Sequence, residues 1–171
     1  MSRAIGFSLK ARIPVTAQGI TMEIRQILAP TDFSEYSKQA VVHAYEFAQT
    51  FGAKLLLLHV IELPVYPVEV FLPSTEGTTL FDDLERQAHL DLARLLPAAQ
   101  DGTVEVRCQA VAGTPYYKII EVAGAEKVDL IVMATHGRTG LSHLVMGSVA
   151  ECVVRMAPCP VLTIHPSSGT A

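Results

Sequence analysis

The chain has 171 residues, a length typical of one domain with its own hydrophobic core. Half of the residues are apolar and only 18% are charged, which excludes a disordered chain. The formal net charge of -4 and the lack of a Lys/Arg run argue against a general nucleic-acid-binding protein. No stretch approaches the roughly 20 apolar residues that a membrane span requires.

The cysteines and the chain ends suggest a cytoplasmic protein with one domain. Cys108, Cys152 and Cys159 are odd in number and lack C-x-x-C spacing, so we expect reduced, mostly buried thiols. Residues 1–21 contain basic residues but no sustained apolar core, and they make a poor secretory signal. We predict a flexible extension over 1–21, a domain over 22–166 and a tail over 167–171.

The first half of the domain shows strand and helix patterns in alternation. A short strand is predicted over residues 24–29, ended by Pro30, and then a helix from the N-cap Ser34 to Gly52. The apolar run 54–61 is typical of a strand buried on both faces of a parallel sheet. A proline-rich loop over 62–77 precedes a second helix, from 78 or 79 to about 96. Its apolar side is expected to be Leu80, Leu84, Ala88, Leu92 and Leu95.

The second half continues the alternation. Strands are predicted over 104–112, 128–134 and 160–165, and helices over 116–124 and 148–156. Thr114 is the expected N-cap of the first of these helices, with Pro115 at its first position. The order predicts an α/β fold, an open five-stranded parallel sheet with helices on both faces. Such sheets bind ligands beyond the carboxyl ends of their strands, where the strand order reverses.

A glycine-bearing loop follows the fourth predicted strand. Residues 138–146 separate Gly137 from Gly147, and Ser148 begins the next helix. Glycines let backbone amides approach an anion, and a helix N-terminus offers free N–H groups to phosphate. The Ser148 hydroxyl would add a hydrogen bond, and Arg138 would add charge at the rim. The same residues also fit a structural role alone, in which the glycines serve turn geometry and Ser148 is an N-cap.

Further candidates lie just past the ends of other strands. The Asp32 carboxylate would accept from ribose hydroxyls or an adenine amino group, or it caps the first helix. The backbone of Val60 would meet an adenine edge, or Val60 is core. Gly113 leaves room for a ligand or makes a turn. A Walker loop is absent, and residues 30–34 lack the glycines of a dinucleotide fingerprint.

Several segments together resemble the universal stress protein family, over about residues 22–165. They are residues 30–34 (PTDFS), 57–60 (LLHV), 111–115 (VAGTP), 133–140 (MATHGRTG), 147–151 (GSVAE) and 157–162 (APCPVL). The resemblance implies a sheet of order 3-2-1-4-5, as in adenine nucleotide alpha hydrolase-like proteins. It also implies a homodimer through the last strand, residues 161–164.

The resemblance further implies an adenine-nucleotide site, for ATP, ADP or AMP, with or without Mg2+. The implied residues are Asp32 for ribose, Val60 for adenine, Met133 beside the adenosine, and Gly137, Gly147, Ser148 and Val149 for phosphates. One position departs from the Gly-x-x-Gly signature of ATP-binding members, because Ala134 stands at its first glycine. Alanine is tolerated there where φ is negative and costly where φ is positive.

We therefore expect a nucleotide-binding stress-response protein that acts as a regulatory dimer toward an unknown protein partner. One alternative is a weak ATP hydrolase or phosphotransferase, with His136 or His143 as acid or base. The other is a nucleotide-free dimeric interaction protein in which Ala134 has closed the pocket.

Overall fold

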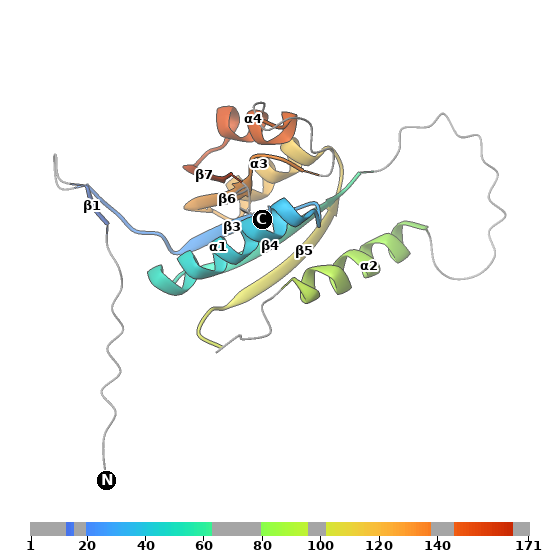
Figure 1. The fold of residues 1–171 in the computed structure, drawn as a ribbon, viewed down its shortest axis with the longest axis horizontal. Helices are drawn as coiled ribbons and strands as arrows, with labels where there is room; N and C mark the ends of the chain where they lie inside the picture. Colours follow the sequence, from blue (N-terminus) through green and yellow to red (C-terminus); the bar gives the residue numbers. More distant parts are fainter. Residues whose placement is uncertain (1–12, 16–19, 63–79, 96–101, 138–145, 166–171) are drawn as a thin grey trace, which may run out of the picture.

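The computed structural model describes residues 13–15, 20–62, 80–95, 102–137 and 146–165. Its main sheet is parallel throughout and has the spatial order β5-β4-β3-β6-β7 (Figure 1). The strands are β3 (Gln26–Thr31), β4 (Lys54–Ile61), β5 (Val106–Ala112), β6 (Leu130–Ala134) and β7 (Val161–Ile164). Counted along the chain within this sheet, their order is 3-2-1-4-5, which confirms the predicted fold.

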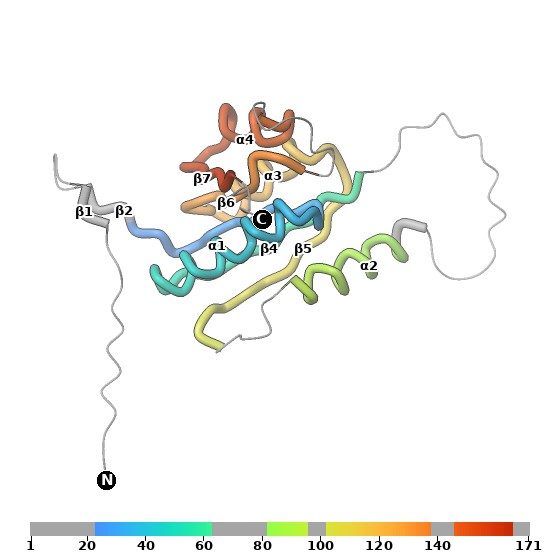
Figure 2. The backbone as a smooth tube through the Cα atoms, in the orientation of Figure 1, coloured from blue at the N-terminus to red at the C-terminus, as the bar shows by residue number. Residues whose placement is uncertain are grey.

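Helices cover both faces of the sheet, and Figure 2 traces the chain between them. The helices are α1 (Glu35–Phe51), α2 (Leu80–Arg94), α3 (Pro115–Ala125) and α4 (Ser148–Met156). Leu55 and Leu57 of β4 pack in one core cluster with residues of α1 and α2. Leu56 and Leu58 alternate with them and pack in a second cluster with α3 and α4. This two-sided burial explains why the sequence of β4 is almost continuously apolar.

Local sequence signals set the helix ends as predicted. The Ser34 hydroxyl caps α1 by accepting a hydrogen bond from the Ser37 N–H at 3.2 Å. Gly52 ends α1 in the left-handed region, at a φ of 64°. Thr114 occupies the N-cap position of α3 and Pro115 follows it, although the Thr114 side chain makes no capping hydrogen bond.

The strands predicted to begin at residues 24, 104 and 128 begin two residues later, at 26, 106 and 130, and two further predicted details are wrong. Pro30 does not end the first strand of the sheet, because β3 continues to Thr31. The registered pairs of β3 with β6 stop at Leu28, so the missing N–H of Pro30 falls where β3 pairs with β4 alone. Leu84 is 38% exposed instead of buried. It lies one turn before Ala88, which packs in a cluster with Ile61 at the end of β4, and Leu84 itself lines a cavity at the carboxyl ends of the strands.

Two short strands precede the sheet, where the sequence predicted none. β1 (Ile13–Val15) and β2 (Ile20–Met22) pair in an antiparallel manner. The domain limits at residues 22 and 166 stay predictions. None of the described helices combines the length and apolar character needed to cross a membrane.

The three cysteines are free, as predicted, but they are half-buried and not mostly buried. Burial raises the pKa of the Cys108 thiol. Burial also raises the pKa of the Cys159 thiol, and the nearby Asp129 carboxylate adds to that effect.

Candidate functional site

A cavity of about 510 Å³ lies at the carboxyl ends of β3, β4 and β6. β3 has β4 on one side and β6 on the other, so the cavity lies where the strand order reverses. Its volume is within the range of small-molecule sites. Its lining includes every predicted binding residue that the structure describes: Asp32, Val60, Met133, Gly137, Gly147, Ser148 and Val149.

Two other predicted positions have different outcomes. Arg138 and the rest of residues 138–145 lie outside the described residues. Gly113 does not line the cavity. Its φ of 144° requires glycine, and its N–H donates to the Ile61 carbonyl at 3.0 Å, so it makes the turn after β5.

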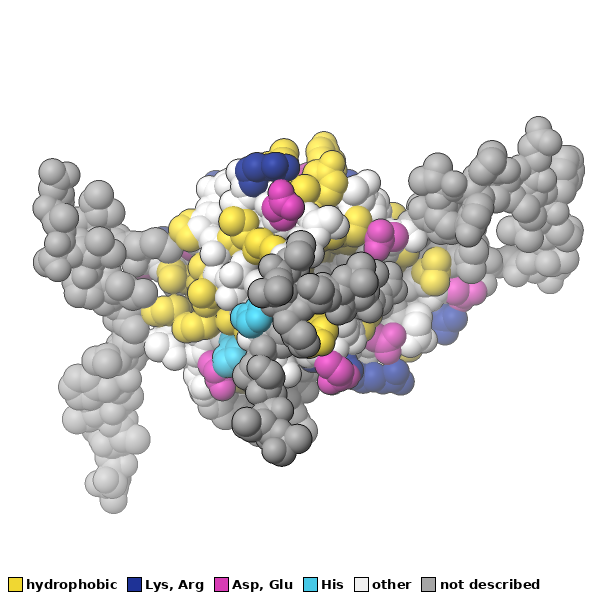
Figure 3. Space-filling model, turned by 45° about the horizontal axis from the view of Figure 1, so that its top comes forward, with side chains coloured by type: hydrophobic (Ala, Val, Ile, Leu, Met, Phe, Trp, Pro, Cys, Tyr) yellow, Lys and Arg dark blue, Asp and Glu magenta, His cyan; other side chains and the backbone are white. Residues whose placement is uncertain are grey.

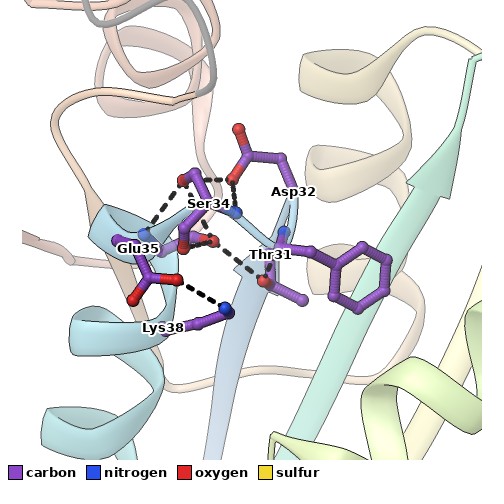
Figure 4. Close-up of polar contacts among 7 residues, drawn as sticks. Thr31, Asp32, Ser34, Glu35 and Lys38 are labelled. Atoms are coloured by element: carbon purple, nitrogen blue, oxygen red, sulfur yellow. Dashed lines mark hydrogen bonds and ion pairs between the residues drawn. The ribbon is translucent and has the colours of Figure 1, made fainter.

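Asp32 lies in the turn between β3 and α1 (Figure 4). Its Oδ1 atom accepts hydrogen bonds from the Ser34 N–H at 3.1 Å and from the Ser34 hydroxyl at 2.6 Å. A Cβ atom added to Gly137 would lie 2.5 Å from Asp32 Oδ2. The first signature glycine that this chain retains therefore allows a close approach between the loop backbone and the carboxylate.

The second glycine, Gly147, joins the start of the loop to α4. Its N–H donates to the Thr135 carbonyl at 2.8 Å. Gly147 is the N-cap of α4, and it has no side chain that could accept hydrogen bonds from the amides of the first turn. The first hydrogen bond of the helix runs from the Glu151 N–H to the Gly147 carbonyl. The amides of Ser148, Val149 and the next residue precede this first helical bond. They lie where α4 meets the cavity, in the arrangement that helix N-termini offer to anions.

Val60 serves as core and as cavity wall at once. Its side chain is buried in the cluster with α3 and α4. The Ile61 carbonyl accepts from Gly113 on the β5 side. Because backbone groups alternate along a strand, the Val60 carbonyl lies on the opposite edge, next to the end of β3 at Thr31.

Ala134 meets the condition under which its methyl group is tolerated. It belongs to β6 and is not among the described residues with positive φ. Val132, two residues earlier, packs in the cluster with α1, whereas Met133 packs in the cluster with α3 and α4. By alternation the Ala134 methyl group is on the α1 face, opposite to Met133.

Sequence reasoning missed several polar residues of the site. Thr31, Ser37, His59 and Glu62 line the cavity. The spacing of Thr31, Ser34 and Ser37 at steps of three around Asp32 was the available signal.

His136 also lines the cavity, at the base of the loop. Its Nδ1 atom is 2.9 Å from Thr135 Oγ1, which is also 3.2 Å from His165 Nδ1. The Nε2 atom of His136 is buried without a hydrogen-bond partner, a state that a ligand group would relieve. Among the described residues, no group of three or more His, Cys, Asp or Glu could hold a metal ion.

The fold is that of an α/β protein with a cavity of small-molecule size at the switch point of its sheet. The universal stress protein family model matches residues 23–165, and the chain belongs to that family. It is 34% identical over 141 residues to universal stress protein MJ0531 of Methanocaldococcus jannaschii, covering 82% of this chain and 81% of that protein.

Solved structures agree with this assignment. The structure of MJ0577 has a TM-score of 0.68 and 30% identity, covering 86% of this chain and 99% of that one. A universal stress protein in complex with cAMP has a TM-score of 0.58 and 24% identity, covering 85% and 99%. The similarity to the cAMP complex, at 24% identity, establishes a shared fold and nothing further.

Proposed function

We propose that this chain binds an adenine nucleotide in the cavity and acts as a regulatory homodimer in the stress response. The observation that carries the proposal is the first turn of α4, which no N-cap side chain covers and which lines the cavity. The Asp32 carboxylate lines the same cavity and supplies an acceptor for ribose hydroxyls. The solved relative that holds cAMP is a precedent for such a ligand on this fold.

The residues present fit a nucleotide. The adenosine would pack beside Met133, with its adenine edge at the Val60 backbone. The phosphates would accept hydrogen bonds from the amides of residues 147–149 and from the Ser148 hydroxyl. Gly137 has no side chain, so the ligand could approach the loop backbone as closely as the Asp32 carboxylate does. Arg138 would add a cation beside the phosphates.

The charge of the cavity bears on the metal. Asp32 and Glu62 line it, and the described lining residues include no Lys or Arg. Besides Arg138, the charge of a triphosphate would be balanced by backbone amides and by a cation that arrives with the nucleotide. We propose Mg2+ for ATP, because Mg2+ is commonly bound through phosphates and few protein ligands.

The dimer would form through β7, which is an edge strand of the sheet. All four residues of β7, from Val161 to Ile164, are half-buried. On α4, Val154 and Met156 are 48% and 53% exposed. Figure 3 shows hydrophobic side chains at the surface of the face that carries α4. A second copy would cover these groups, and we place the dimer in the cytoplasm.

The test begins with mass spectrometry of small molecules released from the purified protein. Calorimetric titrations with ATP, ADP and AMP follow, each with Mg2+ and with EDTA. We expect copurified nucleotide, or saturable binding with a melting temperature that rises with ligand concentration. The absence of both signals would overturn the proposal and favour the nucleotide-free alternative. Multiple turnover of ATP that is lost in His136→Ala would favour the hydrolase alternative.

A further inference from the structure

A chain of hydroxyl groups runs from the end of β3 to the Asp32 carboxylate (Figure 4). Thr31 Oγ1 lies 2.9 Å from Ser37 Oγ. Ser37 Oγ lies 3.3 Å from Ser34 Oγ, and the Ser37 hydroxyl donates to the Ser34 carbonyl at 3.0 Å. The Ser34 hydroxyl donates to Asp32 Oδ1 at 2.6 Å. Three hydroxyl side chains thus surround the turn that carries the proposed ribose acceptor.

The direction of these hydrogen bonds follows from the number of protons. Each hydroxyl has a single proton, and an ionised carboxylate only accepts. Ser34 therefore donates to Asp32, and the Ser37 proton goes to the Ser34 carbonyl. The proton between Thr31 and Ser37 then belongs to Thr31. Thr31 Oγ1 also accepts from the Phe33 N–H at 3.0 Å, so its acceptor side is used as well.

Burial makes this arrangement rigid. Thr31 and Ser37 are 7% and 4% exposed, and a buried hydroxyl without partners is costly. The Thr31 carbonyl accepts from His59 Nδ1 at 2.8 Å, which holds the same turn from β4.

The turn itself contains a strained residue. Phe33 has a φ of 64°, unusual for a residue other than glycine, and its ring lies 4.3 Å from the His59 ring. Such a conformation persists where the surrounding contacts over-determine it. The hydroxyl chain and His59 supply those contacts, next to Asp32.

We propose that Thr31 and Ser37 are positioning residues that fix the Asp32 carboxylate, and thereby make the site selective for nucleotides with free ribose hydroxyls. The inference rests on the proposed nucleotide function and adds the sugar selectivity of the same cavity. A carboxylate held in one orientation favours a ligand whose ribose hydroxyls can donate to it over a ligand without them, because only the first makes these hydrogen bonds.

The test compares ATP with 2′,3′-dideoxy-ATP by calorimetry, in the presence of Mg2+. Wild-type protein is expected to bind ATP about tenfold more tightly than the dideoxy analogue. Ser37→Ala and Thr31→Val remove a hydroxyl each and should bring this ratio close to 1, by weakening ATP more than the dideoxy analogue. Thr31→Ser keeps the hydroxyl and should keep the ratio. It also supplies the matched control if one of the other variants folds poorly.

The outcomes separate this inference from the proposed function. Equal binding of both ligands by wild-type protein would overturn the ribose selectivity and leave nucleotide binding intact. Equal loss of both ligands in Ser37→Ala and Thr31→Val would show that the hydroxyls only support the fold. An unchanged ratio in these variants would also refute a positioning role. If wild-type protein bound neither ATP nor the dideoxy analogue, the proposed function itself would be overturned.

Discussion

Asp32 and Gly137 are in direct contact, since a Cβ atom on Gly137 would lie 2.5 Å from Asp32 Oδ2. The contact joins the turn after β3 to the loop after β6, two segments far apart in the sequence. Only glycine leaves room for both the loop backbone and the carboxylate in their present positions.

Gly137→Ala is therefore expected to displace the Asp32 carboxylate or the loop, and to weaken ATP binding by about tenfold or more. Calorimetric titration measures the loss. Gly124→Ala is the matched control, because nothing lies within 4 Å of a Cβ on this helical glycine. It should raise the free energy of unfolding by up to about 1 kcal/mol and leave ATP affinity unchanged. Equal ATP affinity in both variants would contradict the close approach.

Gly147 leaves the first turn of α4 without a side-chain cap. Gly147→Asp would place a carboxylate at these amides, where it stabilises the helix but competes with phosphate and repels it. We expect ATP affinity to fall by about tenfold or more, and adenosine affinity to change little, because adenosine has no phosphate.

Gly147→Asn separates the charge effect from the steric effect. In both variants the new Cβ atom would lie 3.2 Å from the Thr135 carbonyl oxygen, so both require the same small shift. ATP should bind more tightly to the Asn variant than to the Asp variant. The same loss of adenosine and ATP affinity in the two variants would indicate a distorted loop and no anion site.

Most of the fold could be predicted from the sequence because its signals are local. The apolar run 54–61 and the Gly147–Ser148 pair set the limits of β4 and α4 as observed. Leu84 was misplaced because the helical period does not tell a side chain in the core from one that lines an open cavity. The exposed side of a helix depends on a contact made by residues distant in the sequence.

The candidate site was predictable in its residues but not in its contacts. Strand order brings Asp32 and Gly137 together, and only the three-dimensional structure shows that they touch. The hydrogen bond from His59 to the Thr31 carbonyl depends on the pairing register of β3 and β4. Spacing along the chain does not encode that register, so the hydrogen bond from His59 that supports the Asp32 turn could not be predicted from the sequence.

Ala134→Gly restores the first glycine of the family signature and tests whether the methyl group matters. Ala134 lines the cavity, but its φ is negative and its side chain is a single methyl group opposite to Met133, so we expect ATP affinity to stay within about twofold. The free energy of unfolding should fall by about 0.5–1 kcal/mol, since glycine is unfavourable within a strand. Calorimetry and urea denaturation measure the two effects. A large gain in ATP affinity would show that the methyl group crowds the nucleotide.

The direction of backbone groups in β7 gives a sharp test of the proposed dimer. The Ile164 and Pro160 carbonyls accept from the Thr135 and Ile131 N–H groups of the β6 segment. By alternation, the N–H and carbonyl of Thr163 point away from β6, along the free edge.

Thr163→Pro removes an N–H from this edge without breaking the pairing with β6. We expect light scattering to report a monomer. At low protein concentration, where dimer formation adds little to stability, the melting temperature should stay near that of wild-type protein. Leu162→Pro is the control, because its N–H faces β6 and its loss should destabilise the fold by about 3 kcal/mol. A Thr163→Pro protein that remains dimeric would exclude strand pairing through β7, and the exposed side chains of α4, Val154 and Met156, would then be the surface to substitute.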